Sequence, residues 1–89
     1  MVTLGEMNQR MGELNGWNLQ GNSIVKNYSF KDFKESLEFV NKIGEVAEKF
    51  GHHPDIIINY NQVKLSLTTH AQEGLTEKDF ELAKEIDKI

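Results

Sequence analysis

Residues 55–70, which read DIIINYNQVKLSLTTH, decide the fold. The run 55–60 is rich in isoleucine, a β-branched residue that favours strands. Apolar and polar residues alternate over 63–67, and the strand predicted over 63–70 has two faces. One face carries Val63, Leu65 and Leu67, and the other carries Lys64, Ser66, Thr68 and His70. The polar pair 61–62 separates the two runs. This stretch therefore predicts a β-hairpin whose second strand is half buried.

A second hairpin is predicted upstream of the first. Residues 17–20 alternate in polarity, and the Gly21-Asn22 dipeptide that follows is typical of a turn. The next predicted strand places four side chains on one face, namely Ile24, Lys26, Tyr28 and Phe30. Two such hairpins can join into one four-stranded antiparallel sheet.

Three helices are predicted from capping residues and from apolar residues spaced three and four apart. Capping-box patterns begin the first helix at Thr3 and the last at Thr76, and the pattern Ser29-x-x-Asp32 can cap the longest helix. The longest helix runs to about Phe50, where Gly51 ends it, and the first helix ends before Asn15-Gly16. The residues expected to face the core are Leu4, Met7, Met11 and Leu14 in the first helix and Phe80, Ala83, Ile86 and Ile89 in the last.

The predicted order of elements is helix, strand, strand, helix, strand, strand, helix. We expect an α+β fold in which three helices pack on one face of a four-stranded antiparallel sheet, in a single domain over 1–89. No apolar run approaches the ~20 residues of a membrane helix, and the chain has no cysteine, so we expect a protein of the reducing cytoplasm. The net charge of −4 argues against nucleic acid as a partner.

The apolar side of helix 33–50 is wider than one core contact requires, because it spans roughly half of the helix circumference. Its members are Phe33, Leu37, Val40, Ile43, Ala47 and Phe50, widened by Phe39 and Val46. Two interpretations remain open. One flank meets another subunit, or the helix is deeply buried in the monomer.

All three histidines lie in the second half of the chain, at His52, His53 and His70. An unperturbed imidazole titrates near pH ~6.5 and can exchange protons at neutral pH, although exposed loop histidines are the commoner case. A zinc site is not expected. Pro54 favours an extended conformation at His53, so the two adjacent side chains point to opposite sides.

Two further residues are candidates for this site. Glu48 lies one helical turn before His52, and its carboxylate could pair with that imidazole if the helix frays only after His52. Unless the loop folds back, an ordinary exposed helix carboxylate is the favoured interpretation. Trp17 could form a platform for a planar ligand, although a single tryptophan in a small domain is more often part of the core.

An ordered set of motifs resembles the pterin-4a-carbinolamine dehydratase family. The family pattern A-E-x-x-x-H-H-P, Y-N-x-V, T-H and G-L-T-x-x-D is matched at residues 47–54, 60–63, 69–70 and 74–79. Gly16-Trp17 and the FKDF sequence of residues 30–33 also match, so the resemblance covers the chain from Leu14 onward. Gly51 departs from it, since the family often has a polar or acidic residue there.

The resemblance implies an α+β fold and the dehydration of 4a-hydroxytetrahydropterin to quinonoid dihydropterin, which recycles tetrahydrobiopterin after aromatic amino-acid hydroxylation. It also implies that the enzyme needs no metal or organic cofactor. Family members form dimers or tetramers partly through the long helix, so we expect a homodimer or homotetramer through helix 33–50. The partner it implies is a small pterin, with no membrane.

By resemblance, His52, His53 and His70 match the family's active-site histidines. We expect His52 and His70 to transfer protons and His53 to position the ring or stabilise charge. The remaining matched or adjacent residues have supporting roles. Glu48 would orient His52, Trp17 would lie against the pterin, and Thr68 and Thr69 would offer backbone groups to its amide edge.

Two alternatives to this function remain. The first is a non-catalytic binding protein of the same fold, because the family in animals also acts as a dimerisation cofactor for a homeodomain transcription factor. The second is a pterin-site enzyme in molybdopterin metabolism, whose local proton chemistry would look the same.

Overall fold

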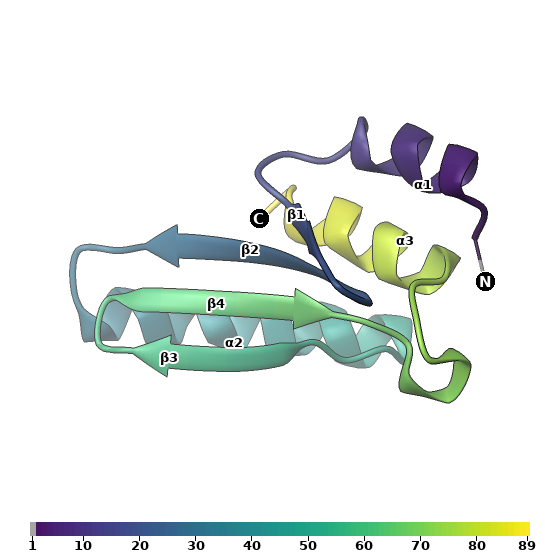
Figure 1. The fold of residues 1–89 in the computed structure, drawn as a ribbon. Coiled ribbons are helices and arrows are strands. Elements are labelled where there is room, and N and C mark those ends of the chain that lie inside the picture. The colour runs from purple at the N-terminus through teal and green to yellow at the C-terminus, as the bar shows by residue number, and fades with distance from the viewer. Residues whose placement is uncertain (1) are drawn as a thin grey trace.

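The computed structural model describes residues 2–89; Met1, with which the predicted domain begins, lies outside the described residues. The elements in chain order are α1 (Leu4–Met11), β1 (Asn18–Gln20), β2 (Ser23–Ser29), α2 (Phe33–Phe50), β3 (Asp55–Asn59), β4 (Gln62–Leu67), the 3₁₀ turn η1 (His70–Gln72) and α3 (Glu77–Ile86) (Figure 1). The predicted α+β fold class and element order are confirmed. None of the described helices has the length and apolar character needed to cross a bilayer.

The sheet has the strand order β1-β2-β4-β3, and every pairing is antiparallel. The β2–β4 pairing joins the two predicted hairpins, with Ile24 opposite Leu67 and Tyr28 opposite Val63. Burial alternates along β4 as expected, with the odd-numbered side chains in the core. The strand ends at Leu67 and not at His70, because the next residues leave the sheet to form a short loop.

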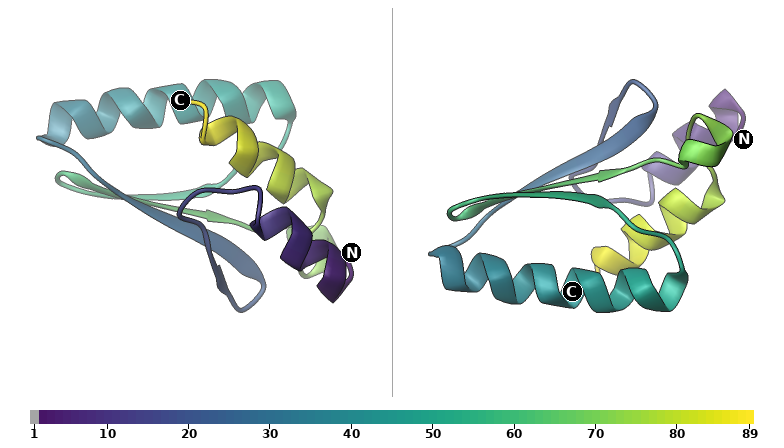
Figure 2. Two further views of the ribbon diagram at one scale, coloured as in Figure 1. Left: turned by 90° about the horizontal axis from the view of Figure 1, so that it is seen from above. Right: turned by 90° about the horizontal axis from the view of Figure 1, so that it is seen from below.

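The helices form a layer beside the sheet (Figure 2). α2 runs along one face and contacts both β4 and α3. α1 lies against the outer side of α3, where Arg10 pairs with Glu77 at 2.5 Å and Glu13 lies 3.7 Å from Lys84. Ile43, from the middle of α2, is fully buried in the same core.

Three predicted details were wrong. α1 ends at Met11, because Gly12 caps it and the following residues form turns; Leu14 still packs against the core. In α3, Leu82 is fully buried, whereas Ile89 lies beyond the helix and is 46% exposed. The hairpin turn between β3 and β4 lies one residue earlier than expected, since Gln62 already belongs to β4.

The wide apolar side of α2 is only partly covered. Ile43 and Ala47 are buried, but Phe33, Leu37 and Phe50 at its flank and ends are 48%, 39% and 38% exposed. Deep burial within the monomer therefore accounts for the middle of this helix and not for its ends.

Candidate functional site

The chain reverses direction at the end of α2 through Gly51. This glycine is the C-cap, with φ of 64°, a left-handed conformation that costs other residues energy. A Cβ at this position would meet no atom within 4 Å, so the conformation and not the available space requires glycine. The left-handed conformation therefore favours a glycine at position 51, where the sequence departs from the expected family pattern.

His52 is held by a buried carboxylate. Its Nε2 lies 2.5 Å from Oδ1 of Asp79, whose side chain is 0% exposed. The other oxygen, Oδ2, accepts from the Thr69 hydroxyl at 2.8 Å and from the Thr76 backbone N–H at 2.9 Å. Burying a carboxylate is costly unless it is hydrogen-bonded, and here both oxygens have partners.

These contacts fix the direction of the hydrogen bonds. An ionised carboxylate only accepts, so Nε2 of His52 donates to Asp79, and Nδ1 is the nitrogen left to accept a proton. The single hydroxyl proton of Thr69 goes to Asp79. The Thr76 hydroxyl, 2.8 Å from that of Thr69, is therefore the donor in their mutual hydrogen bond.

The structure corrects the expected partner of Glu48. Its carboxylate contacts Nε2 of His53 and not His52, which turns inward to Asp79. The adjacent imidazoles point to different sides, as the extended backbone before Pro54 predicts. The His53 and Glu48 side chains are 60% and 78% exposed, and an ion pair in that setting adds little stability.

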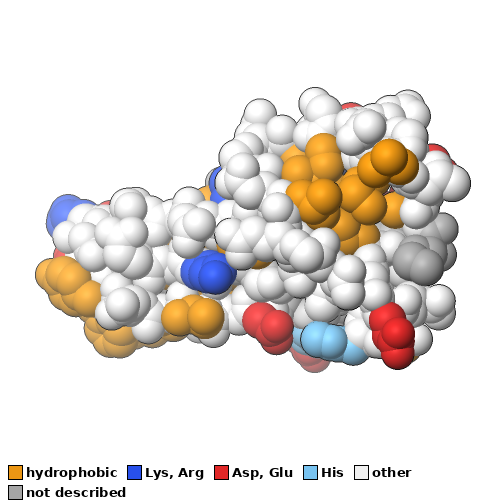
Figure 3. Space-filling view, in the orientation of Figure 1, with side chains coloured by type: hydrophobic (Ala, Val, Ile, Leu, Met, Phe, Trp, Pro, Cys, Tyr) orange, Lys and Arg blue, Asp and Glu red, His pale blue; other side chains and the backbone are white. Residues whose placement is uncertain are grey.

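His70 is exposed and begins η1 immediately after Thr69. The loop is closed at its base by two backbone hydrogen bonds between Thr69 and Gly74, of 3.1 and 3.3 Å. Because Thr69 and His52 bond to the same Asp79 carboxylate, the two distant histidine-bearing segments meet at α3. Figure 3 shows histidine atoms at the surface between acidic side chains on this face.

Trp17 belongs to the core, which was one of its two interpretations. It is 6% exposed, and its Nε1 donates to Oδ1 of Asp87 at 2.9 Å. The same oxygen accepts from Lys26 at 2.9 Å. Asp79 and Asp87 lie near opposite ends of α3, about 12 Å apart along the axis at 1.5 Å per residue. The tryptophan hydrogen bond is therefore remote from the His52 hydrogen bond.

The two threonines before His70 differ in role. The Thr68 hydroxyl donates to the Asn22 carbonyl at 2.6 Å, which ties β4 to the β1–β2 turn. Thr69 belongs to the Asp79 network, and its backbone N–H and C=O are already bonded to Gly74. The expectation that the Thr69 backbone binds the pterin edge is therefore unsupported.

Asp79 is the residue whose site role the sequence interpretation missed. It was expected only as a helix-capping residue, and it does complete the capping box with Thr76. Asp79 is the last residue of the matched G-L-T-x-x-D motif, and this position was the indication in the sequence that it belongs to the site. Among residues 2–89, no group of three or more potential metal ligands is arranged to hold an ion.

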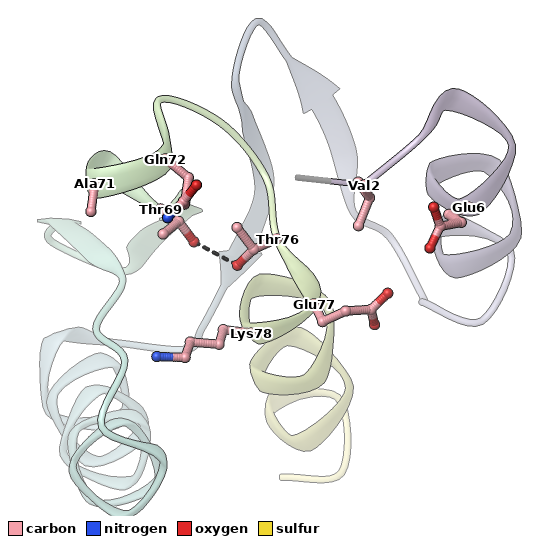
Figure 4. A pocket seen from close by; sticks show the side chains of 8 residues that line it. All are labelled: Val2, Glu6, Thr69, Ala71, Gln72, Thr76, Glu77 and Lys78. Atoms are coloured by element: carbon pink, nitrogen blue, oxygen red, sulfur yellow. Dashed lines mark hydrogen bonds between the residues drawn. The ribbon is translucent and has the colours of Figure 1, made fainter.

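A cavity of about 520 Å³ adjoins this network (Figure 4). It lies between the start of α1, with Val2 and Glu6, and the segment from Thr69 to Lys78. Its wall includes the hydrogen-bonded Thr69 and Thr76, but the histidines lie outside its lining.

Comparison with known proteins identifies the family. The family model described as Pterin 4 alpha carbinolamine dehydratase matches residues 2–89. A protein of Sulfolobus acidocaldarius named "Putative pterin-4-alpha-carbinolamine dehydratase" is 51% identical over 84 residues, covering 94% of this chain and 92% of its own. A protein of the same name from Trichormus variabilis is 50% identical over 84 residues, covering 94% and 90%.

Solved structures agree with this assignment. The crystal structure of a transcriptional coactivator/pterin dehydratase from Brucella melitensis superimposes with a TM-score of 0.90 at 35% identity, over 98% of this chain and 95% of that one. A pterin dehydratase-like RuBisCO assembly factor of the alpha-carboxysome shares the fold, with a TM-score of 0.70 at 20% identity over 85% and 90%. The chain belongs to the pterin 4 alpha carbinolamine dehydratase family.

Proposed function

We propose that this protein dehydrates 4a-hydroxytetrahydropterin in the recycling of tetrahydrobiopterin. In this reaction the C4a–O bond breaks, the N5 proton is removed, and a C4a=N5 double bond forms as water leaves. An acid must protonate the departing oxygen and a base must take the N5 proton. Family membership supports the reaction class, and the hydrogen bond between His52 and the buried Asp79 is the observation that carries the mechanism.

We assign proton transfer to His52 and His70. With Nε2 of His52 bonded to Asp79, Nδ1 is available as a base, in the manner of a histidine oriented by a carboxylate. His70 is exposed beside the same network and supplies the second proton-transfer group. His53, paired with Glu48, positions the ring or stabilises its charge, and Glu48 thus acts through His53.

A stopped-flow assay with chemically generated 4a-hydroxytetrahydropterin tests this function. We expect the wild-type protein to accelerate dehydration, and His52→Ala/His70→Ala to lose roughly 10²-fold or more, the contribution of one positioned acid or base. A double variant that matches the wild type would remove the catalytic proposal. Tetrahydrobiopterin recycling and molybdopterin metabolism differ in the physiological substrate. The same assay, run with the pterin of each pathway, therefore distinguishes these two roles.

We also propose self-association through α2, as a homodimer or homotetramer. The exposed Phe33, Leu37 and Phe50 support it, because the free energy falls when another surface covers such apolar side chains and removes them from water. Leu37→Glu is expected to reduce the mass measured by light scattering. Lys42→Glu, at an exposed polar position of the same helix, is the matched control.

The same α2 surface favours a second candidate function, a binding protein without catalysis. The Brucella melitensis relative is named as a transcriptional coactivator as well as a pterin dehydratase. A protein that forms complexes through Leu37 yet fails the dehydration assay would support this candidate over the enzyme.

A further inference from the structure

Thr69 connects the two chain segments that carry the proposed proton-transfer groups. Its backbone directly precedes His70, and its N–H and C=O bond to Gly74 at 3.1 and 3.3 Å, which closes the loop at its base. Its side-chain hydroxyl donates to Oδ2 of Asp79 at 2.8 Å, and Oδ1 of the same carboxylate accepts from Nε2 of His52. Thr69 is therefore linked to His70 through the chain and to His52 through a single carboxylate.

The Thr69 hydroxyl has a fixed direction in this network. It accepts from the Thr76 hydroxyl at 2.8 Å, so its own proton remains for Asp79 (Figure 4). The backbone N–H of Thr76 is the second donor to Oδ2, and Nε2 of His52 is the donor to Oδ1. Because the Asp79 side chain is 0% exposed, bulk solvent cannot replace a donor that is lost.

The orientation of the Asp79 carboxylate depends on its hydrogen bonds. The torsion between Cβ and a carboxylate has a broad, roughly two-fold preference, so the side chain itself fixes this angle only weakly. The Thr69 hydroxyl and the Thr76 N–H together hold Oδ2, and this leaves Oδ1 turned toward His52. The His52 side chain is only 13% exposed and bonds to this oxygen through Nε2, so the plane of the carboxylate in turn orients the imidazole.

We propose that Thr69 is a positioning residue for the reaction and acts on His52 through Asp79. The inference rests on the dehydratase function proposed above. The Thr69 hydroxyl fixes the plane of the carboxylate, and the carboxylate presents Nδ1 of His52 to the substrate. A catalytic group that is misplaced by about 1 Å can lose about 10²-fold in rate, so this hydroxyl affects turnover without contacting the substrate. The alternative is a structural role, in which the Thr69 backbone closes the loop and the hydroxyl does not affect the reaction.

Thr69→Val separates the hydroxyl of this residue from its backbone. Valine keeps the β-branched shape and both backbone hydrogen bonds to Gly74, but it has no donor for Asp79. In the stopped-flow assay we expect kcat to fall by about 10–100-fold, since His52 remains but is no longer held in place, and KM to stay within about threefold of the wild-type value. Thr69→Ser restores the hydroxyl, so its kcat should lie within about threefold of the wild-type value.

A spectroscopic signature of His52 tests the positioning role independently of activity. In the wild type the Nε2 proton bonds to a buried carboxylate, so its ¹H–¹⁵N signal should be protected from exchange with water. Thr69→Val should lose this protection, because its carboxylate is free to turn away from the ring, and Thr69→Ser should keep it. The urea midpoint of unfolding is measured for each variant, because a role in stability alone would lower this midpoint and leave the ring signal unchanged.

Ser36→Ala is the matched control, because it also removes a buried hydroxyl. Ser36 is 0% exposed, and its hydroxyl donates to the Asp32 carbonyl at 3.1 Å. It lies near the start of α2, about 21 Å before the end of this helix at 1.5 Å per residue, and His52 follows that end. This variant should lower the urea midpoint and leave kcat and the His52 signal unchanged. Thr69→Ala removes the same hydroxyl as Thr69→Val and replaces it in the test if the valine variant does not fold.

Two results would overturn the positioning role while the enzyme function stands. In the first, a folded Thr69→Val protein has the kcat and the His52 signal of the wild type. In the second, Thr69→Ser loses as much activity as Thr69→Val, which shows that the hydroxyl is not the cause of the loss. A wild type that is no faster than His52→Ala/His70→Ala would instead overturn the dehydratase function, and the His52 signal would then decide alone whether the Thr69 hydroxyl holds the ring.

Discussion

Replacing Asp79 with asparagine changes the charge and the donor pattern at His52 with almost no change in shape. Asp79 accepts three hydrogen bonds, from Nε2 of His52, the Thr69 hydroxyl and the Thr76 backbone N–H. Asparagine can keep the two on Oδ2 through its carbonyl oxygen, but its NH₂ group then faces His52. The imidazole must accept from this group, so its proton moves to Nδ1.

The expected loss of activity follows from this change of tautomer. A His52 that is protonated on Nδ1 cannot take a proton there, so the dehydration rate should fall by about 10²–10⁴-fold, the contribution of one general base. One charge-assisted hydrogen bond is lost, and the free energy of unfolding should fall by about 1.5–3 kcal/mol.

Three measurements test this prediction of the Asp79→Asn effect. Stopped-flow dehydration gives the rate, urea unfolding gives the stability, and ¹⁵N chemical shifts of the His52 ring report which nitrogen carries the proton. Asp55→Asn, the same chemical change at an exposed position of β3, should leave all three unchanged. A folded Asp79→Asn protein that dehydrates the substrate at the wild-type rate would refute the role of Asp79.

Three other predictions concern stability. Gly51→Ala should lower the free energy of unfolding in urea by about 1–2 kcal/mol, because alanine is strained at the φ of 64° there. Tyr28 has a buried hydroxyl without a hydrogen-bond partner among residues 2–89, so Tyr28→Phe should leave stability at pH 7 unchanged or raise it by up to about 1 kcal/mol. The pKa of Tyr28 is raised by burial and then by Asp87, so the folded state holds this proton more tightly than the unfolded state. Wild-type stability should therefore fall as pH rises above about 10. Tyr28→Phe should weaken that fall in alkaline urea titrations, and Tyr60→Phe at an exposed position should not. Asp87→Ala should lower the thermal midpoint and alter Trp17 fluorescence, since it leaves the buried indole N–H unpaired at a cost of about 1–3 kcal/mol.

Most of the fold follows from local patterns in the sequence. Alternation over 63–67 indicates which side of β4 is buried, and capping residues such as Asp32 and Thr76 mark helix starts. These patterns span only a few residues. They are strong because a half-buried strand must place its apolar side chains on one face, and because a helix end must satisfy backbone groups that have no partner within the helix. The exact end of β4 was not predictable in this way, because the Thr69–Gly74 bridge that closes the loop forms after the alternation has ended.

The candidate site was only partly predictable from the chain. The sequence placed His52 and His53 in a loop and indicated that their side chains diverge. It suggested Glu48 as the partner of His52, because that pairing is local, whereas the structure uses Asp79, 27 residues further along the chain. A contact across that separation depends on how α3 packs, which no local spacing encodes.

The Asp79 carboxylate also has a consequence for the order of events in synthesis. His52 and Thr69 leave the ribosome before the residue that joins them, and that residue lies in the last helix of the described chain. A nascent protein that already contains all three histidines would therefore still lack an oriented base. Competence for the proposed reaction would arise only when the C-terminal helix docks, and transient undocking of that helix would reversibly abolish it.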